Sequence, residues 1–255
     1  NAWGGTAVAD NCGTCDSDPT NDCSAEPSID CRGVLGGNAP DADCTFQARW
    51  KTDNPGESGD NQITLPLVQG GEYDFLVLWG DGSQDTITTY DPAATSTPWT
   101  HTYDVAGEYD ITIVGRIKGW QFLRSRSGGI SAWGRGDAEK LLLIDNWGAL
   151  EISTDGAFFG CTHLTSAAGG APIITTSSLA YTFAYATAFN GAIGNWNTAA
   201  VTSMYSMFRG AAAFNQPLDG PDWNTSAVTN MSYMFWSAAA FNQPLDGSGW
   251  VTGAV

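Results

Sequence analysis

Two stretches in the middle of the chain alternate side chains with the period of a β-strand. Residues 73–79 place Tyr, Phe, Val and Trp at every second position, and residues 109–113 place Tyr, Ile and Ile in the same way. The first stretch is apolar on both faces beyond Asp74, so we expect a central strand there and a half-buried strand in the second. Glycine-containing segments at 79–82 and 106–107 supply turns. Residues 46–146 are therefore predicted to form a small β-sandwich.

A second pattern repeats every 25 to 27 residues in the C-terminal part. The segment Trp196-Asn-Thr-Ala-Ala-Val201 returns at 223–228 and in altered form at 250–255, and Phe-Asn-Gln-Pro-Leu-Asp-Gly stands at 214–220 and 241–247. A block of Met, Tyr, Ser, Met and Phe at 204–208 returns in a similar order at 231–235. A period of this length is that of one coil in a solenoid, where each unit buries its apolar face only against its neighbours.

Each predicted coil combines three local structures. The Val-Thr-x-Met stretch is expected to form a short strand, the Met-Phe-x-x-Ala stretch a helical turn, and the Asn-Gln-Pro-Leu-Asp-Gly stretch a turn, because Pro and Gly interrupt regular structure. The predicted inward-pointing residues share apolar character and repeat spacing. They are Val201, Met204, Phe208, Phe214, Val228, Met231, Phe235 and Phe241.

The repeat region is assigned to residues 147–255. Its last repeat stops at Val255, in the middle of a unit. A solenoid needs a polar cap at its end, and this region shows none. The expectation is that the sequence is an excerpt of a longer repetitive chain.

The N-terminal residues 1–45 are rich in cysteine and acidic residues. Their five cysteines stand in a stretch too polar to build a core, which favours a disulfide-stapled module from an oxidising compartment over a zinc site. Two segments 32 residues apart, at 3–12 and 35–44, share a Gly pair followed by Cys. The pairing of the cysteines stays open. The disulfide candidates are Cys12, Cys15, Cys23, Cys31 and Cys44.

The charge of the chain narrows the classes of partner. It carries 27 acidic and 10 basic residues, for a net charge of −17. Such a surface repels nucleic acid and anionic lipid, so we expect no nucleic-acid partner. No apolar run reaches the length of about 18 residues that predicts a transmembrane helix, so no membrane insertion is expected in this segment.

Few residues in the chain could carry chemistry. Asp16, Asp18 and Asp22 alternate between two cysteines and could bind Ca²⁺ through their oxygens, but the spacing lacks the Gly and the distal Glu of a Ca²⁺ hand loop, so a solvated acidic turn is favoured. Ca²⁺ is therefore the one candidate cofactor. His101 is interpreted as a hydrogen-bonded structural residue, and Asp81 as the first residue of an Asx turn. Cys161 and His163 lack a third partner for nucleophilic catalysis, and no catalytic residue is predicted.

The chain resembles two families of extracellular module. The segment Trp79-Gly-Asp-Gly-Ser83, followed by His101-Thr-Tyr-Asp-Val-Ala-Gly107 and the strand at 109–113, resembles the PKD-type immunoglobulin-like domain. The phrases FNQPLDG and WNTSAVTNMSYMF resemble the BspA-type leucine-rich repeats of bacterial surface proteins. The Cys-rich start resembles acidic extracellular repeats. The fold class expected is mainly β: a small disulfide module, a PKD-like sandwich, then a leucine-rich-type solenoid.

The resemblance implies a non-catalytic protein that is secreted or displayed on a bacterial cell surface. Its expected role is structural or adhesive, with other surface proteins, matrix, glycans or copies of itself as partners. Stacked repeats could also assemble into a filament through a heterologous interface. The alternative is a carbohydrate-binding accessory module of a larger secreted enzyme.

Overall fold

The structure is a computed structural model of the chain. It describes residues 44–88, 99–123, 136–167, 170–247, 249–253 and 255. This described part is mainly β, as expected, and its only helical element is the 3-10 turn Ala138–Lys140. The strands are β1 Thr45–Lys51, β2 Gln62–Thr64, β3 Leu67–Leu78, β4 Gln84–Ile87, β5 Thr100–Thr102, β6 Glu108–Trp120, β7 Leu141–Asn146, β8 Leu150–Ile152, β9 Ser166–Ala167 and β10 Ile173–Ile174.

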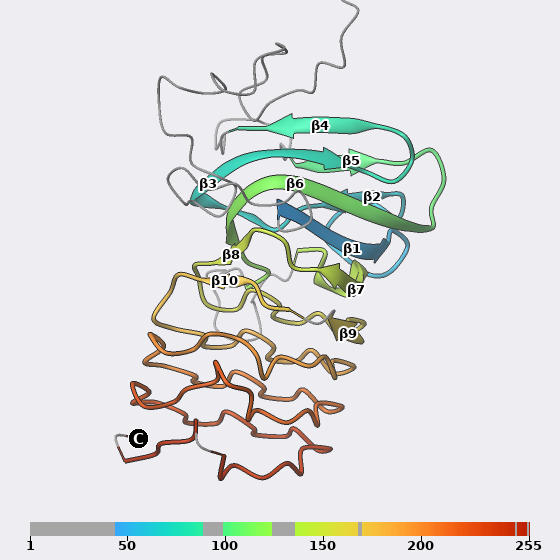
Figure 1. Cartoon of the computed structure of the whole chain (residues 1–255). Helices are drawn as coiled ribbons and strands as arrows, with labels where there is room; N and C mark the ends of the chain where they lie inside the picture. The colour runs from blue at the N-terminus through green and yellow to red at the C-terminus, as the bar shows by residue number, and fades with distance from the viewer. Residues whose placement is uncertain (1–43, 89–98, 124–135, 168–169, 248, 254) are drawn as a thin grey trace, which may run out of the picture.

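The upper part of the molecule in Figure 1 is a pair of sheets built around the two predicted strands. β3 lies between β4 and β6, and β6 also pairs with β1, all antiparallel. β2 and β5 form a separate two-stranded sheet. From Tyr73 on, every second residue of β3 is buried, and the buried side chains of both sheets belong to one apolar core. Its largest members before residue 124 are Trp50, Trp79, Trp120 and Tyr103.

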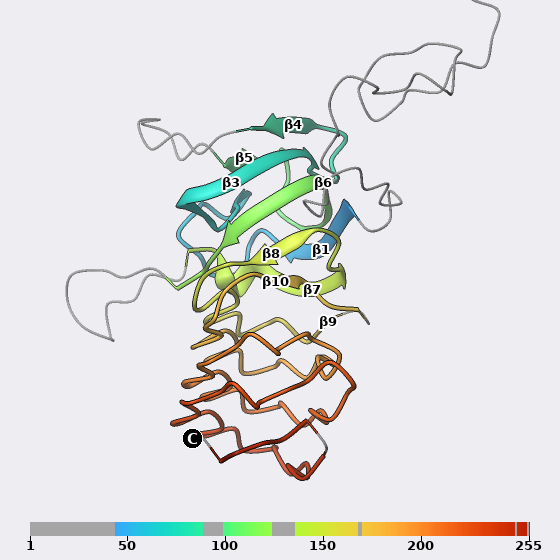
Figure 2. The same ribbon diagram turned by 60° about the vertical axis from the view of Figure 1, so that its left-hand side comes forward.

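The coils of the C-terminal part continue this sheet without a break. β7 pairs antiparallel with β1, and β8 pairs parallel with β6. The next coil adds β9 beside β7 and β10 beside β8. A chain of ion pairs crosses the join, since Arg116 contacts Glu72 at 2.8 Å and the buried Glu151 at 3.1 Å. The first coil thus pairs with β1 through β7 and with the C-terminal part of β6 through β8. Figure 2 shows these strands beside one another.

A buried polar cluster fastens the loop between β1 and β2 to the segment before β7. Both oxygens of Asp137, a residue only 1% exposed, accept hydrogen bonds from this loop. The ammonium of Lys140 donates to Ser58 Oγ at 2.8 Å and to the carbonyls of Gly59 at 2.8 Å and Gln62 at 2.9 Å. Burial lowers the pKa of Lys140, although nearby acids, Asp137 first among them, oppose the shift. The cluster replaces the water that these polar groups lose on folding.

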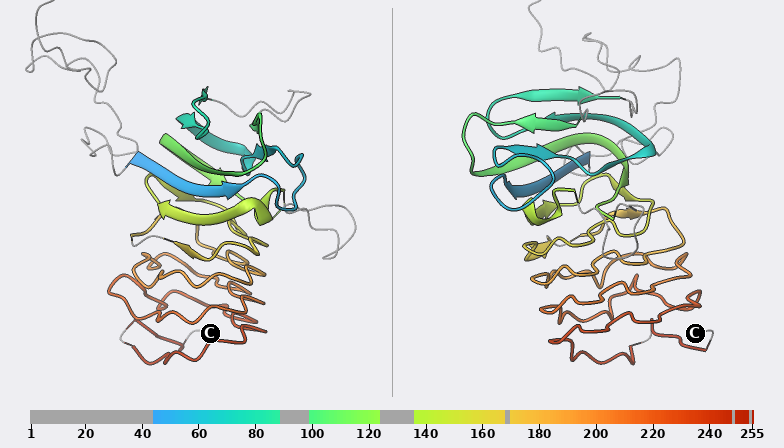
Figure 3. Two further views of the ribbon diagram at one scale, coloured as in Figure 1. Left: turned by 90° about the vertical axis from the view of Figure 1, so that its right-hand side faces the viewer. Right: turned by 180° about the vertical axis from the view of Figure 1, so that it is seen from behind.

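Below the sheets, the chain winds into coils that lie one above another (Figure 3). The coils after β10 are joined by isolated parallel bridges at Ser178, Ser203 and Asn230 rather than by extended strands. Main-chain hydrogen bonds link equivalent segments of successive coils. The amide N–H of Phe183, for example, donates to Met207 and that of Phe208 to Met234, both at 2.9 Å. The stack is therefore held by main-chain bonds as well as by side chains.

The predicted helical turn after each Met is wrong. In residues 204–210 every second N–H donates to the following coil, and the intervening N–H groups close tight turns within the coil. A helix would direct all of these donors back along its own chain. Left-handed residues make the alternation possible. They form two columns through the stack, Gly156–Tyr181–Ser206–Tyr233 and Gly160–Tyr185–Gly210–Ser237, with φ between 53° and 72°.

These left-handed columns give a first test of the fold. Gly210→Ala should destabilise the protein by about 1–2 kcal/mol, because alanine is strained at positive φ. Its new Cβ would also lie 2.9 Å from Cδ1 of Tyr185. Ser237→Gly should instead stabilise by about 0.5–1 kcal/mol, since it relieves the same strain at some cost in chain entropy. Urea unfolding measures both, and Gly253→Ala, where the new Cβ meets nothing within 4 Å, is the near-neutral control.

Stacked phenylalanine rings form the interior of the coils. One column joins Phe158, Phe183, Phe208 and Phe235, with ring centroids 5.4 to 5.9 Å apart. A second joins Phe189, Phe214 and Phe241 at 5.8 to 6.0 Å. Of the residues predicted to point inward, Val201, Met204, Phe208, Phe214 and Val228 are fully buried, whereas Met231, Phe235 and Phe241 are partly buried.

Polar residues of the repeat motifs form ladders beside these rings. The side chain of Asn190 accepts the N–H of Asn215 at 2.9 Å, and that of Asn215 accepts the N–H of Asn242 at 2.8 Å. The buried hydroxyl of Thr198 donates to the carbonyl of Asn224 and accepts its N–H. The Phe-Asn and Trp-Asn-Thr phrases therefore recur because each supplies one apolar side chain and one group that satisfies the neighbouring coil's main chain.

Candidate functional site

Part of the predicted site lies outside the described residues. Asp16, Asp18 and Asp22, the candidate Ca²⁺ ligands, belong to that part, as do Cys12, Cys15, Cys23 and Cys31. Cys44 is described and is disulfide-bonded. Within the described residues no group of three or more His, Cys, Asp or Glu side chains is placed to hold a metal ion. No helix among them is long and apolar enough to cross a membrane.

His101 and Asp81 meet in the sandwich. The Nε2 atom of His101 lies 2.7 Å from Asp81 Oδ2 and 3.3 Å from Ser83 Oγ, and its ring stacks on Trp79 at 4.7 Å. Asp81 also accepts the N–H of Ser83 at 2.9 Å, which is the predicted Asx turn. A nucleophilic triad needs the base to contact the nucleophile and the acid through different ring nitrogens. Here Ser83 and Asp81 both contact Nε2 of His101, so the three residues lack the geometry of a triad. Their contacts instead join the β3–β4 turn to β5.

The ionisation of Asp81 should make the contact between the β3–β4 turn and β5 sensitive to acid. Burial of the carboxylate raises its pKa, but hydrogen bonds from Ser83 and His101 outweigh burial and lower the pKa from 3.8 to about 2. A pKa that is lower in the folded state stabilises the fold above pH 3.8, and this stabilisation disappears as the pH falls towards 2. Asp81→Asn should therefore lower the melting temperature at pH 6 but make little difference at pH 2. Melting curves between these values test it, with the exposed Asp74→Asn as control.

Cys161 and His163 do not form a reactive pair. Cys161 is fully buried, and burial raises the pKa of its thiol well above the ordinary value, which disfavours the nucleophilic thiolate. His163 is exposed, and its Nδ1 lies 2.9 Å from the main-chain oxygen of Glu139. Cys161 packs in the core, and His163 contacts the segment before β7 through Glu139.

The most distinctive side-chain cluster lies on the outside of the left-handed turns. We call it the aromatic face and define it by Tyr181, Tyr185, Tyr205, Tyr233, Trp236 and Arg209. Tyr205 contacts Tyr181 and Tyr233 edge to face, with centroids 5.2 and 5.9 Å away. Burial, followed by a hydrogen bond with Tyr205, raises the pKa of Tyr181 to about 12. Tyr233 and Trp236, which lie in the last coil described, are 57% and 52% exposed.

Arg209 stands among these rings as the charged member of the aromatic face. Its guanidinium carbon lies 4.6 Å from the ring centre of Trp236 and 5.9 Å from those of Tyr185 and Tyr233. A cation within about 6 Å of an aromatic face is attracted by the ring electrons. The cluster thus combines flat apolar surfaces, hydroxyl groups and one positive charge, which suits binding rather than bond making.

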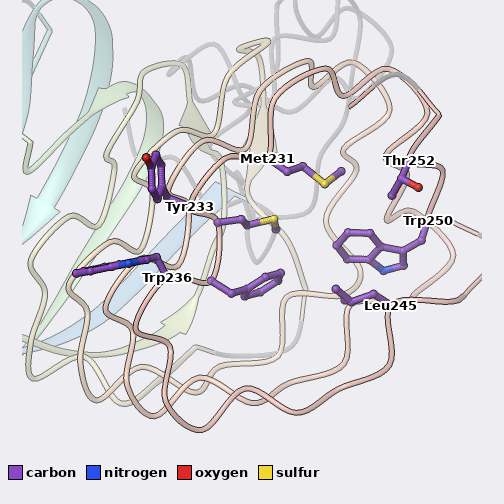
Figure 4. A pocket seen from close by; sticks show the side chains of 8 residues that line it. Met231, Tyr233, Trp236, Leu245, Trp250 and Thr252 are labelled. Carbon is purple, nitrogen blue, oxygen red and sulfur yellow. The ribbon is translucent and has the colours of Figure 1, made fainter.

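An apolar cavity of about 430 Å³ adjoins the aromatic face at the end of the stack. Figure 4 shows Tyr233 and Trp236 together on one side of it, and Leu245, Trp250 and Thr252 on the opposite side. Met231, Met234 and Phe235 complete its lining. The equivalent residues of the preceding coil, Met204, Met207 and Phe208, are fully buried under this last coil. The cavity is therefore lined by the core positions of the last coil described.

The sequence contained a signal for this face that the repeat analysis did not use. Tyrosine recurs in both Met/Phe blocks, as Tyr205 and Tyr233, at positions that the repeat analysis did not assign to the core. Arg209 and Trp236 each directly follow a core phenylalanine.

Comparison with known proteins gives one match. Residues 153–255 match the family model described as "Mycoplasma protein of unknown function, DUF285". The match begins directly after β8, covers the following coils and less than half of the chain, and is compatible with a BspA-type surface protein. No curated protein and no solved structure matches the chain.

Proposed function

We propose that the chain is a non-catalytic structural or adhesive part of a secreted or cell-surface protein. In this proposal residues 147–255 are a BspA-type leucine-rich solenoid, and residues 46–146 are a PKD-like sandwich that caps its first coil. The observation that carries the proposal is the uninterrupted sheet from β6 and β1 into the coils. This pairing disfavours a hinge between the two parts, which supports a body that presents one surface at a fixed distance and angle.

The proposed contact surface is the aromatic face. Tyrosine, tryptophan and arginine are the residues that dominate binding energy at interfaces, because they bring large contact area and polar groups together. The partners proposed are matrix or surface glycans, other surface proteins or further copies of the chain. Residues 1–45 would form an acidic disulfide module before the sandwich.

Labelling of the source cells tests the proposed location. Antibodies against the chain should label intact cells, and treatment of those cells with an external protease should remove the label. A label that appears only after lysis contradicts a surface role. An antibody against a cytosolic protein of the same cells is the control for leakage.

The second candidate is a carbohydrate-binding accessory module of a larger secreted enzyme. It is favoured by the row of tyrosine rings in the aromatic face, since aromatic rings offer apolar area beside a polar handle. This candidate predicts that the chain binds the polysaccharide that the attached enzyme degrades. It also predicts that the whole protein is released into the medium. Purification of the native protein distinguishes the two, because only the second candidate copurifies with a covalently linked hydrolytic activity.

A further inference from the structure

Two segments of the coils carry the acceptor pattern for N-linked glycans. This pattern is Asn, then any residue except Pro, then Ser or Thr. The sequence contains it at Asn224-Thr-Ser226 and at Asn230-Met-Ser232. The first lies in the repeated phrase that begins with a core tryptophan, and the coil before it carries Asn197-Thr-Ala199 at the equivalent place. The later coil therefore completes the pattern, and the earlier coil lacks only its serine.

The fold explains the asparagine of this phrase but not the serine. The side chains of Asn197 and Asn224 each close a turn, since their Oδ1 atoms accept the N–H groups of Ala199 at 3.2 Å and of Ser226 at 2.8 Å. Ser226 is exposed, and its hydroxyl makes no hydrogen bond with the residues that the structure describes. Because alanine closes the same turn one coil earlier, the hydroxyl of Ser226 is left for a role outside the fold.

The turn leaves the amide nitrogen of Asn224 accessible. The N–H of Ser226 can donate only to an acceptor, so Oδ1 of Asn224 faces the main chain and Nδ2 is turned away from it. Within the described part of the chain Nδ2 forms no hydrogen bond, and it is not buried. Thr225, by contrast, is buried, and its hydroxyl accepts the N–H of Val251 at 2.8 Å. The next coil thus holds the middle of the acceptor segment in place.

The outward position of Asn224 does not depend on its distance from the end of the sequence. Asn197 occupies the same place one coil earlier, lies under the coil of Asn224 and is still exposed. Asn224 is itself followed in the stack by the coil of Val251. Asn230 lacks such evidence, since its counterpart Ser203 is half-buried in the row of bridges between coils.

We propose that Asn224 carries an N-linked glycan. The modification is a glycosyl transfer from a sugar that is linked through its anomeric carbon to a diphosphate carrier. Nδ2 of Asn224 forms a bond to that carbon, the bond from the carbon to the carrier oxygen breaks, and the diphosphate leaves with the bonding electrons. The proton that Nδ2 loses passes to a base of the transferase, which recognises the hydroxyl of Ser226. The inference rests on the proposed export of the chain, because such glycans belong to the surface of secreted proteins.

Mass spectrometry of the whole protein, purified from its source cells, tests the proposal. The chymotryptic peptide that contains Asn224 should carry the added mass of a glycan, and electron-transfer fragmentation should place that mass on Asn224. Ser226→Ala should abolish the modification without disturbing the turn, since Ala199 closes the equivalent turn. Ala199→Ser should add a glycan at Asn197, which is the unmodified internal control in the natural sequence.

All variants are expressed in the source cells behind an export signal of those cells, and their folding is checked by melting curves. Four outcomes would overturn the proposal. They are an unmodified Asn224 in the exported chain, a glycan that persists in Ser226→Ala, a glycan on Asn230 alone, and modification of Asn197 without the new serine.

Labelling of intact cells reports the natural location of the protein separately. An unmodified Asn224 in a chain that labels at the surface contradicts the glycan and leaves the surface role standing. A chain that reaches the outside only with the added signal, and is then modified at Asn224, supports the glycan site and contradicts the surface role.

Discussion

Replacing Asp137 by alanine is expected to lower the free energy of unfolding by about 3–5 kcal/mol. Its carboxylate accepts the N–H groups of Glu57 and Ser58 at 3.0 Å and of Thr64 at 2.7 Å. Alanine would leave these partly buried donors without an acceptor and would remove an acid that favours the charged form of Lys140. Urea unfolding at pH 7, followed by tryptophan fluorescence, measures the loss.

A matched acidic residue shows whether burial is the cause. Asp110 forms an ion pair with Arg49 on the surface, with 64% of its side chain exposed. Asp110→Ala should therefore cost only about 0–1 kcal/mol. Asp137→Asn keeps one acceptor oxygen and should fall between the two alanine variants. A loss at Asp137 no larger than that at Asp110 would show that the cluster does not fasten the loop.

The second large effect is expected at the centre of the ring columns. Phe208→Ala should destabilise the protein by about 3–5 kcal/mol, because the ring is fully buried and little can collapse into its space. The ring contacts Phe214 at 4.1 Å, Phe235 at 5.6 Å and Phe183 at 5.9 Å. One substitution thus removes contacts to two neighbouring coils as well as within its own.

The same substitution one coil further on is the control. Phe235 occupies the equivalent place but is only partly buried and stacks on a single neighbouring coil in the described part of the chain. Phe235→Ala should cost about half as much as Phe208→Ala, since it removes fewer contacts. Thermal unfolding of both variants compares them. A larger loss at Phe235 would mean that the columns do not stack as described.

The sequence predicted the strands well because they follow one simple period. The alternation at 73–79 lies in β3 except for Trp79, which directly follows it, and that at 109–113 lies in β6. Both strands extend further than the alternation. β3 begins at Leu67 because its pairing with β6 shifts register between Leu67 and Glu72, and such an irregularity interrupts the pattern without ending the strand.

The coils were predicted by their spacing but not by their local structure. The repeats fixed which residues lie one above another, since 25 or 27 residues bring Phe183, Phe208 and Phe235 into one column. They could not show that Tyr181, Tyr185 and Ser206 adopt positive φ. Tyrosine is disfavoured there, so the local preference was overridden by the main-chain bonds between coils.

The aromatic face was not predicted because its members do not keep one register. Tyr185 lies two residues after its core phenylalanine, whereas Arg209 and Trp236 lie one residue after theirs. These side chains come into contact because of the way the left-handed turns orient neighbouring positions. The repeat spacing alone does not predict that orientation. A lone arginine in such a sequence is usually interpreted as a solvated charge.

The hydrogen bonds between coils also determine how the molecule would respond to mechanical force. They run from one coil to the next, roughly along the direction in which a pull on the C-terminus would act, so the load falls on the outermost coil first. Each coil depends only on its neighbours, and we expect the stack to unravel in steps of one coil. A step would release 25 to 27 residues, or about 80–100 Å of extended chain. The sandwich would be loaded last, because β1 and β6 are joined over seven residue pairs in register.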